Sequence, residues 1–193
     1  MMRRMPALAM ALGAVSIAVV TAYKEGPAPA MTGGFGEPNC TKCHFDNALN
    51  DRRGSLSIDG IPAAFVAGRE YPLTVTLRRA GLARGGFELS ARYAPGSADA
   101  GRQAGTLRPR DGRMQIVSVP GGAVQYIQHT KTGSAAATRG MLRWTFTWIA
   151  PAASHDASRA VEFDLAGNAS NDDASPLGDF VYVLSKRSRS AGK

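Results

Sequence analysis

The sequence contains few of the residues from which most catalytic and metal sites are built. It has only two cysteines and three histidines in 193 residues, and no combination of acid, base and nucleophile stands out along it. A disulfide framework is excluded, because two cysteines can form only one bridge. The length suits one domain with a substantial core but not two large ones. We therefore expect a single-domain protein that is not an enzyme.

Long amphipathic helices are also missing. After Gly54, no segment keeps apolar residues at positions i, i+3, i+4 and i+7 over three turns without a glycine or proline. Apolar and polar residues instead alternate with a period of two, most strictly in residues 73–77. This alternation is typical of half-buried strands. The sequence therefore predicts a β protein rather than a helical one.

Turn signals divide the chain after Gly54 into short strands. Clusters such as Gly-Gly, Lys-Thr-Gly, Ala-Pro and Asp-Asp separate them. The predicted strands are Gly54–Asp59, Tyr71–Arg78, Phe87–Tyr93, Met114–Val119, Ala123–Gln128, Met141–Trp148, Ala160–Leu165 and Phe180–Leu184. We therefore predict a mainly β fold over residues 54–185, an antiparallel immunoglobulin-like sandwich of about eight strands. Trp144, Phe146 and Trp148 share one strand face and are expected in its core.

One long apolar run is present, at the N-terminus. It extends from Met5 to Val20 behind two arginines and contains no charged residue. The run is shorter than the ~20 residues needed to cross a bilayer, so a signal peptide fits better than a membrane anchor. We assign residues 1–22 to a signal peptide, with an uncleaved anchor as the alternative. The protein is accordingly expected in the periplasm, outside the cell or at its surface.

Acidic residues are outnumbered by basic ones, 15 to 23, which gives a formal net charge of +8. Part of the excess lies in residues 186–193, which we interpret as a solvated basic tail. Nucleic acid is not an expected partner of an exported protein. The candidate targets of the tail are an anionic membrane surface, as a peripheral contact, or an acidic redox partner.

Both cysteines lie in one motif, Cys40-Thr41-Lys42-Cys43-His44. This is the C-x-x-C-H pattern of covalent haem attachment, in which two thiols bind the haem vinyl groups and the histidine binds the iron. Two intervening residues allow both sulfurs to reach one edge of the macrocycle. We therefore expect one haem c, bound through Cys40 and Cys43, with His44 as the proximal iron ligand. Residues 23–53, whose first half is rich in glycine and proline, are expected to form an irregular arm that carries this motif.

Three other chemistries compete for the two thiols. A thioredoxin-like redox pair would require a βαβ context, which the sequence does not predict. A Cys₂His₂ zinc site would have to use His129 and His155, whose separation is far outside the usual H-x₃₋₅-H spacing. A simple disulfide is the remaining alternative.

The second axial ligand of the iron would decide between electron transfer and the binding of small ligands. His129 is the candidate histidine, because it follows an alternating stretch and would lie at the end of a strand. A hydrogen-bonded structural role is its alternative. His155 lies in a polar loop and is expected to be solvated. The methionine candidates are Met31, in the arm, and Met114 and Met141, which begin predicted strands.

The motif and several other segments together resemble a known family. The segments are Gly26-Pro27, Thr32-Gly33, Glu37–His44, Ile61-Pro62, Tyr71–Val75, Gly86–Leu89, His129-Thr130, Trp144–Pro151, Ala166–Asn171 and Gly178-Asp179. In these the chain resembles bacterial exported proteins with a Reeler-like (reelin N-terminal-like) sandwich, the choice-of-anchor domain group, carrying a c-type cytochrome motif. The resemblance implies a haem-bearing leader packed on one immunoglobulin-like sandwich, in the envelope or outside the cell, without a defined enzymatic activity.

The sequence thus predicts an exported monohaem c-type cytochrome that transfers single electrons to a redox partner it does not identify. The alternative is a surface or envelope binding module in which haem is structural or senses small ligands. A haem enzyme such as a peroxidase would need a catalytic histidine and arginine over the iron, and no motif for such a pair is recognisable.

Overall fold

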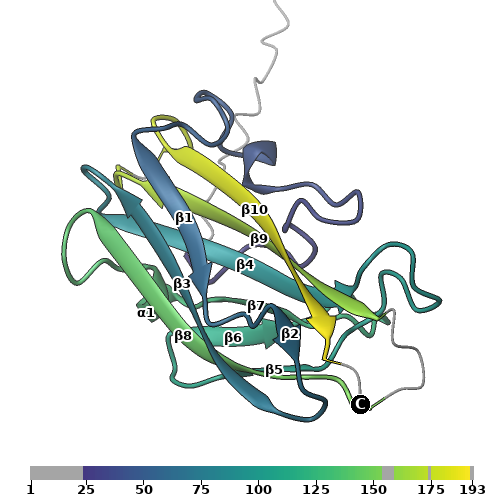
Figure 1. Cartoon of the computed structure of the whole chain (residues 1–193). Coiled ribbons are helices and arrows are strands. Elements are labelled where there is room, and N and C mark those ends of the chain that lie inside the picture. The colour runs from purple at the N-terminus through teal and green to yellow at the C-terminus, as the bar shows by residue number, and fades with distance from the viewer. Residues whose placement is uncertain (1–23, 154–158, 174, 192–193) are drawn as a thin grey trace, which may run out of the picture.

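The computed structural model describes residues 24–153, 159–173 and 175–191. The predicted signal peptide and His155 lie outside these residues. The described part forms two β-sheets packed face to face (Figure 1). The predicted β-sandwich is therefore confirmed. Within the described ranges, no helix is long and apolar enough to span a membrane.

The four-stranded sheet has the order β1-β3-β8-β5. Its strands are β1 (Gly54–Asp59), β3 (Glu70–Arg79), β8 (Met141–Ile149) and β5 (Thr106–Pro109). The six-stranded sheet has the order β2-β10-β9-β4-β7-β6. Its strands are β2 (Ala64–Phe65), β10 (Phe180–Ser190), β9 (Ala160–Ser170), β4 (Arg84–Tyr93), β7 (Tyr126–His129) and β6 (Met114–Val117). Every strand pair is antiparallel except the short β2, which runs parallel to β10.

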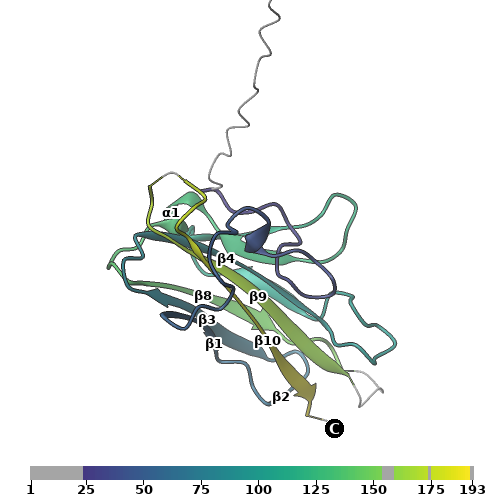
Figure 2. The ribbon, with the colours of Figure 1, turned by 90° about the horizontal axis from the view of Figure 1, so that it is seen from above.

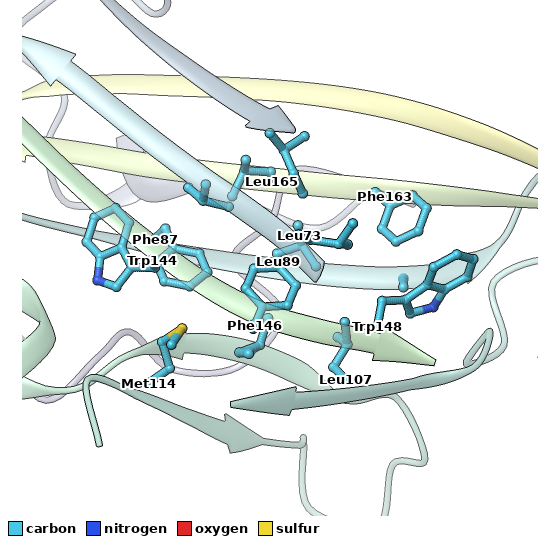
Figure 3. Close-up of a cluster of buried hydrophobic side chains, with 14 of the residues drawn as sticks. Leu73, Phe87, Leu89, Leu107, Met114, Trp144, Phe146, Trp148, Phe163 and Leu165 are labelled. Atoms are coloured by element: carbon cyan, nitrogen blue, oxygen red, sulfur yellow. The ribbon is translucent and has the colours of Figure 1, made fainter. Parts of the chain in front are cut away.

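The core lies between the two sheets. Trp144, Phe146 and Trp148 alternate along β8 and are at most 1% exposed, as their spacing predicts (Figure 3). Phe87 of β4 packs against Trp144 with 4.7 Å between ring centroids, and Phe163 of β9 meets Trp148 edge to face at 4.8 Å. Aromatic pairs at these distances add to the stabilisation from apolar burial. The sandwich therefore has a complete core of its own.

Strand β4 is buried on both faces, although only one of them is apolar. Phe87, Leu89 and Ala91 belong to the core cluster, whereas Glu88, Ser90 and Arg92 alternate with them and are 0 to 5% exposed. These polar side chains lie on the outer face of the six-stranded sheet. The arm, residues 24–53, crosses that face and covers them (Figure 2). The arm and the outer face therefore enclose a second, polar interior.

The structure corrects the prediction that residues 186–193 form a solvated basic tail. Residues 186–190 continue β10, and Lys186 to Arg189 pair with Phe163 to Ala160 of β9. Ser188 is fully buried, and Lys186 Nζ donates a hydrogen bond to Ile58 O at 2.7 Å. The sequence did not predict a strand here because its basic side chains extend along the surface. No alternation of apolar and polar residues therefore marks this end of β10. Lys186, Arg187 and Arg189 are exposed. Their contact with a membrane or an acidic partner stays a prediction, and the contact would be made by the end of β10 rather than by a tail.

Further differences concern the length of β9 and the number of strands. β9 extends to Ser170, beyond the predicted end at Leu165, and β2 and β5 were not predicted. Two- and four-residue strands are too short to show a periodicity, so their existence depends on the partners that they pair with.

Candidate haem-binding site

Buried polar contacts hold the arm on the sheet. Glu37 of the arm lies 2.7 Å from the guanidinium of Arg92 on β4 and accepts a 2.6 Å hydrogen bond from the hydroxyl of Tyr126 on β7. Thr32 Oγ1 donates to the second carboxylate oxygen of Glu37 at 2.6 Å. A buried ion pair is costly to break from one side, because it leaves an unpaired charge. These contacts therefore position the segment that follows Glu37.

That segment is the cysteine motif. The side chain of Asn39 accepts a hydrogen bond from Thr41 N at 2.8 Å and caps a short 3₁₀ helix, η1 (Cys40–Lys42). The amides of Cys43 and His44 both donate to Cys40 O, at 3.2 and 3.0 Å. This compact turn gives Cys40, Cys43 and His44 one defined arrangement.

All three residues of the motif line one cavity between the arm and the outer face of β4 and β9. Its volume is about 250 Å³. Gly85 and Gly86 of β4 are among its lining residues. A Cβ atom at Gly85 would lie 2.7 Å from Asn168 O, and one at Gly86 would overlap the ring of His129. The missing side chain at Gly86 therefore makes room for the ring of His129, whereas that at Gly85 makes room for Leu77 and Leu142 of the core.

The imidazole of His44 has an acidic neighbour. Its Nδ1 lies 2.8 Å from Oδ2 of Asp179, whose side chain is 1% exposed. Asn168 Nδ2 donates to the same carboxylate oxygen at 3.1 Å. The two groups are within ion-pair distance, although His44 Nδ1 has no hydrogen bond in the described part of the chain. An imidazole that turns its Nδ1–H toward a carboxylate presents Nε2 as the metal-binding atom. The two thiols and the imidazole that the turn brings together are the donor set that covalent haem attachment requires.

The geometry gives no support to the competing uses of the thiols. Cys40 and Cys43 are free, and burial raises the pKa of the Cys40 thiol to about 12, although part of the residue is accessible. Catalytic redox cysteines have a lowered pKa instead. Across the described ranges, no group of three or more His, Cys, Asp or Glu residues is arranged to hold a metal ion.

His129 lines the same cavity as His44. It is the last residue of β7, as predicted, and is 6% exposed. Its Nδ1 lies 3.1 Å from Phe87 N and 3.2 Å from Phe87 O. If Nδ1 accepts from the amide, the proton of the neutral ring is on Nε2, whereas donation to the carbonyl leaves Nε2 able to bind iron. The structure thus brings His129 to the site and is compatible with both roles predicted for it.

The three methionine candidates separate clearly. Met31 lines the cavity, and its amide donates to Glu88 Oε1 at 2.6 Å. Met114 is 4% exposed and belongs to the core between the sheets (Figure 3). Met141 begins β8 in the other sheet. Only Met31 of the three is therefore placed where it can approach a group bound to the motif.

Sequence reasoning assigned no role to Asp179, Asn168 or Glu88. Asp179 immediately precedes β10, and Asn168 lies opposite Gly86 in the ladder between β9 and β4. All three come from segments far from the motif in sequence. No local pattern marks them, because their proximity to it depends on how the arm lies across the sheet.

Comparisons with known proteins relate to the fold alone. No protein-family model and no curated protein matches the chain. The reeler domain of human F-spondin (fragment 1) is 19% identical, with 75% of this chain and 95% of that chain covered and a TM-score of 0.49. The Reelin-N domain of F-spondin is 17% identical, with 78% of this chain and 96% of that chain covered and a TM-score of 0.48. A cohesin module of a Clostridium perfringens family 33 glycoside hydrolase is 11% identical, with 72% and 98% covered and a TM-score of 0.45.

Proposed function

We propose that this protein is an exported monohaem c-type cytochrome, with haem c bound to Cys40 and Cys43 and its iron bound by His44. The observation that carries the proposal is the position of all three residues on one cavity, with His44 Nδ1 2.8 Å from Asp179 Oδ2. Export is supported by the apolar run at the N-terminus, which lies outside the described residues. Its expected role is single-electron transfer in the cell envelope.

The chain contributes the environment of the haem. Bound haem would supply a one-electron iron couple. The two thiols would fix it to the arm, and the buried contacts of Glu37 with Arg92 and Tyr126 would hold the arm against the sheet. Phe87, Pro27 and Met31 contribute apolar lining to the cavity. A reaction that moves only an electron requires no acid or base from the chain.

A second candidate function is ligand sensing or partner binding by a haem-bearing surface module. The observation that favours it is the contact of His129 Nδ1 with the backbone of Phe87. If that nitrogen accepts the amide proton, His129 does not bind iron. The second axial position would then be open to an exogenous ligand unless Met31 fills it.

Covalent attachment is tested by producing the chain together with a c-type maturation system. Haem should remain with the polypeptide in denaturing electrophoresis and add the mass of one haem. The Cys40→Ala/Cys43→Ala variant should lose both signals, whereas the matched variant Met141→Leu should retain them. A full-length wild-type chain without haem stain would overturn the proposal.

The same preparation distinguishes the two functions. A low-spin ferric spectrum that His129→Ala converts to a high-spin, carbon-monoxide-binding form after reduction identifies His129 as second ligand and favours electron transfer. A low-spin spectrum lost in Met31→Leu identifies Met31 instead. A wild-type protein that is high-spin and binds added imidazole favours sensing.

A further inference from the structure

We infer that Asp179 is a positioning residue for His44: it holds the imidazole with Nδ1 protonated and Nε2 toward the cavity, and it strengthens the bond of Nε2 to iron. This inference rests on the proposed function, since it names the group that adjusts the iron ligand. The observation behind it is the 2.8 Å distance between His44 Nδ1 and Asp179 Oδ2.

Asp179 is well placed to act on one partner. Its side chain is 1% exposed, and among the described residues it forms no ion pair with a lysine or arginine. Its other oxygen, Oδ1, and the Nδ1 of His44 are both buried, and neither has a hydrogen-bond partner in that part of the chain. The contact between His44 and Asp179 is thus an ion-pair contact at 2.8 Å. A buried carboxylate without a basic neighbour interacts strongly with any positive charge nearby. His44 is the group within reach that can supply such a charge.

The position of Asp179 is itself well supported. Asn168 Nδ2 donates to its Oδ2 at 3.1 Å, and Asn47 Nδ2, three residues after His44, donates to its backbone oxygen at 2.9 Å. Asn168 lies within β9, and Asp179 immediately precedes β10. The carboxylate is therefore fixed by the sheet, whereas the histidine it contacts belongs to the arm. Asp179 thus aligns the motif with the outer face of the sandwich.

Two consequences follow from a carboxylate in this place. A neutral imidazole whose Nδ1–H donates to Asp179 must carry its free electron pair on Nε2, the atom that faces a bound iron. The negative charge also makes the imidazole a stronger electron donor, as carboxylate partners do for metal-bound histidines. A stronger donor stabilises ferric over ferrous iron and lowers the reduction potential.

The effect on the iron is tested by the midpoint potential of the haem-loaded protein. Asp179→Asn keeps an oxygen that can accept from Nδ1 but removes the charge, so the potential should shift upward while haem stays covalently attached. Asp164→Asn is the matched control, because Asp164 is a 1% exposed carboxylate of β9 on the same outer face that bonds Ser185. It measures the shift caused by replacing a buried carboxyl group of this face that makes no ion pair with His44. An Asp179→Asn shift no larger than that of Asp164→Asn would overturn the inference.

The effect on the histidine is tested without haem, in the Cys40→Ala/Cys43→Ala chain. Nitrogen-15 spectra at alkaline pH, where imidazoles are neutral, should show His44 protonated on Nδ1. Adding Asp179→Ala should move the proton to Nε2, whereas Asp179→Asn should leave it on Nδ1. A proton on Nε2 of His44 beside an intact Asp179 refutes the inference whether or not haem attaches. Absence of haem from the wild-type chain refutes the proposed function alone.

Discussion

Single polar residues beneath the arm have environments that their neighbours in sequence do not reveal. Glu88 is fully buried on the outer face of β4 and accepts a 2.6 Å hydrogen bond from Met31 N. Burial raises its pKa to about 8, a rise that the nearby Glu37 increases and the backbone donors of Met31 and Ala30 oppose. This carboxyl group is therefore protonated in the folded protein at pH values where it is ionised in the unfolded chain.

The raised pKa of Glu88 predicts a pH dependence of stability. Between pH 4.5, the ordinary value, and about 8, the folded state holds a proton that the unfolded state has lost. The free energy of unfolding should then decrease as pH rises through this window, by up to about 1.4 kcal/mol per pH unit. Glu88→Gln removes this slope, so its stability relative to wild type should grow from pH 5 to pH 8 in urea titrations. Glu70→Gln, at an exposed side chain, is the control, and parallel wild-type and Glu88→Gln curves would contradict the assignment.

At the scale of elements, the arm and β10 each add to the six-stranded sheet in a different way. The arm covers its outer face, and β10 joins β9 to the short β2 at its edge. Lys186, Arg187 and Arg189 near the end of β10 are exposed and flank the buried Ser188. Charged side chains on a strand near a sheet edge also discourage pairing with other molecules. The basic segment therefore contributes to the fold as well as to the surface charge.

Shortening β10 separates these two contributions. Ending the chain after Ser185 removes the last four residue pairs of the ladder to β9 and the pairing with β2. At ~1 kcal/mol per lost backbone hydrogen bond, it should lower the free energy of unfolding by roughly 2 to 4 kcal/mol. The variant Lys186→Gln/Arg187→Gln/Arg189→Gln keeps the strand and removes only charge, so it should stay within about 1 kcal/mol of wild type. Chemical denaturation measures both. Equal stability of the shortened chain and wild type would show that this segment is a tail after all.

At the scale of the whole molecule, the proposed haem site and the hydrophobic core are largely separate, and among the described residues only Phe87 belongs to both. The core cluster lies between the sheets and contains none of Cys40, Cys43 and His44. The cavity lies outside it and is lined by residues of the arm, β4 and β9. In a sandwich of this kind, haem would be an addition to a domain that already buries its own aromatic core.

This separation predicts that the protein folds without haem. The Cys40→Ala/Cys43→Ala chain should retain a far-ultraviolet circular dichroism spectrum dominated by β-structure and unfold in one cooperative transition, because two-state unfolding depends on the core. Amide exchange should increase mainly in the arm. A collapsed state without fixed tertiary packing would mean that haem is part of the core. Trp144→Ala is the matched variant that should damage the core itself, at a cost of about 3 to 5 kcal/mol.

The sequence by itself determined the features that depend on near neighbours. Alternation along β1, β3 and β8 predicted these strands to within a residue at each end, because which side of a strand is buried depends on local order. The C-x-x-C-H pattern is equally local, and it specified the candidate attachment residues and His44 as candidate ligand. Only the tertiary structure decided what lies opposite them. The Asp179 contact of His44, the place of Met31 rather than Met114 on the cavity, and the strand in residues 186–190 all require segments distant in sequence to meet. Such contacts are made by strand pairing and by the path of the arm across the sheet, and no short stretch of residues encodes either.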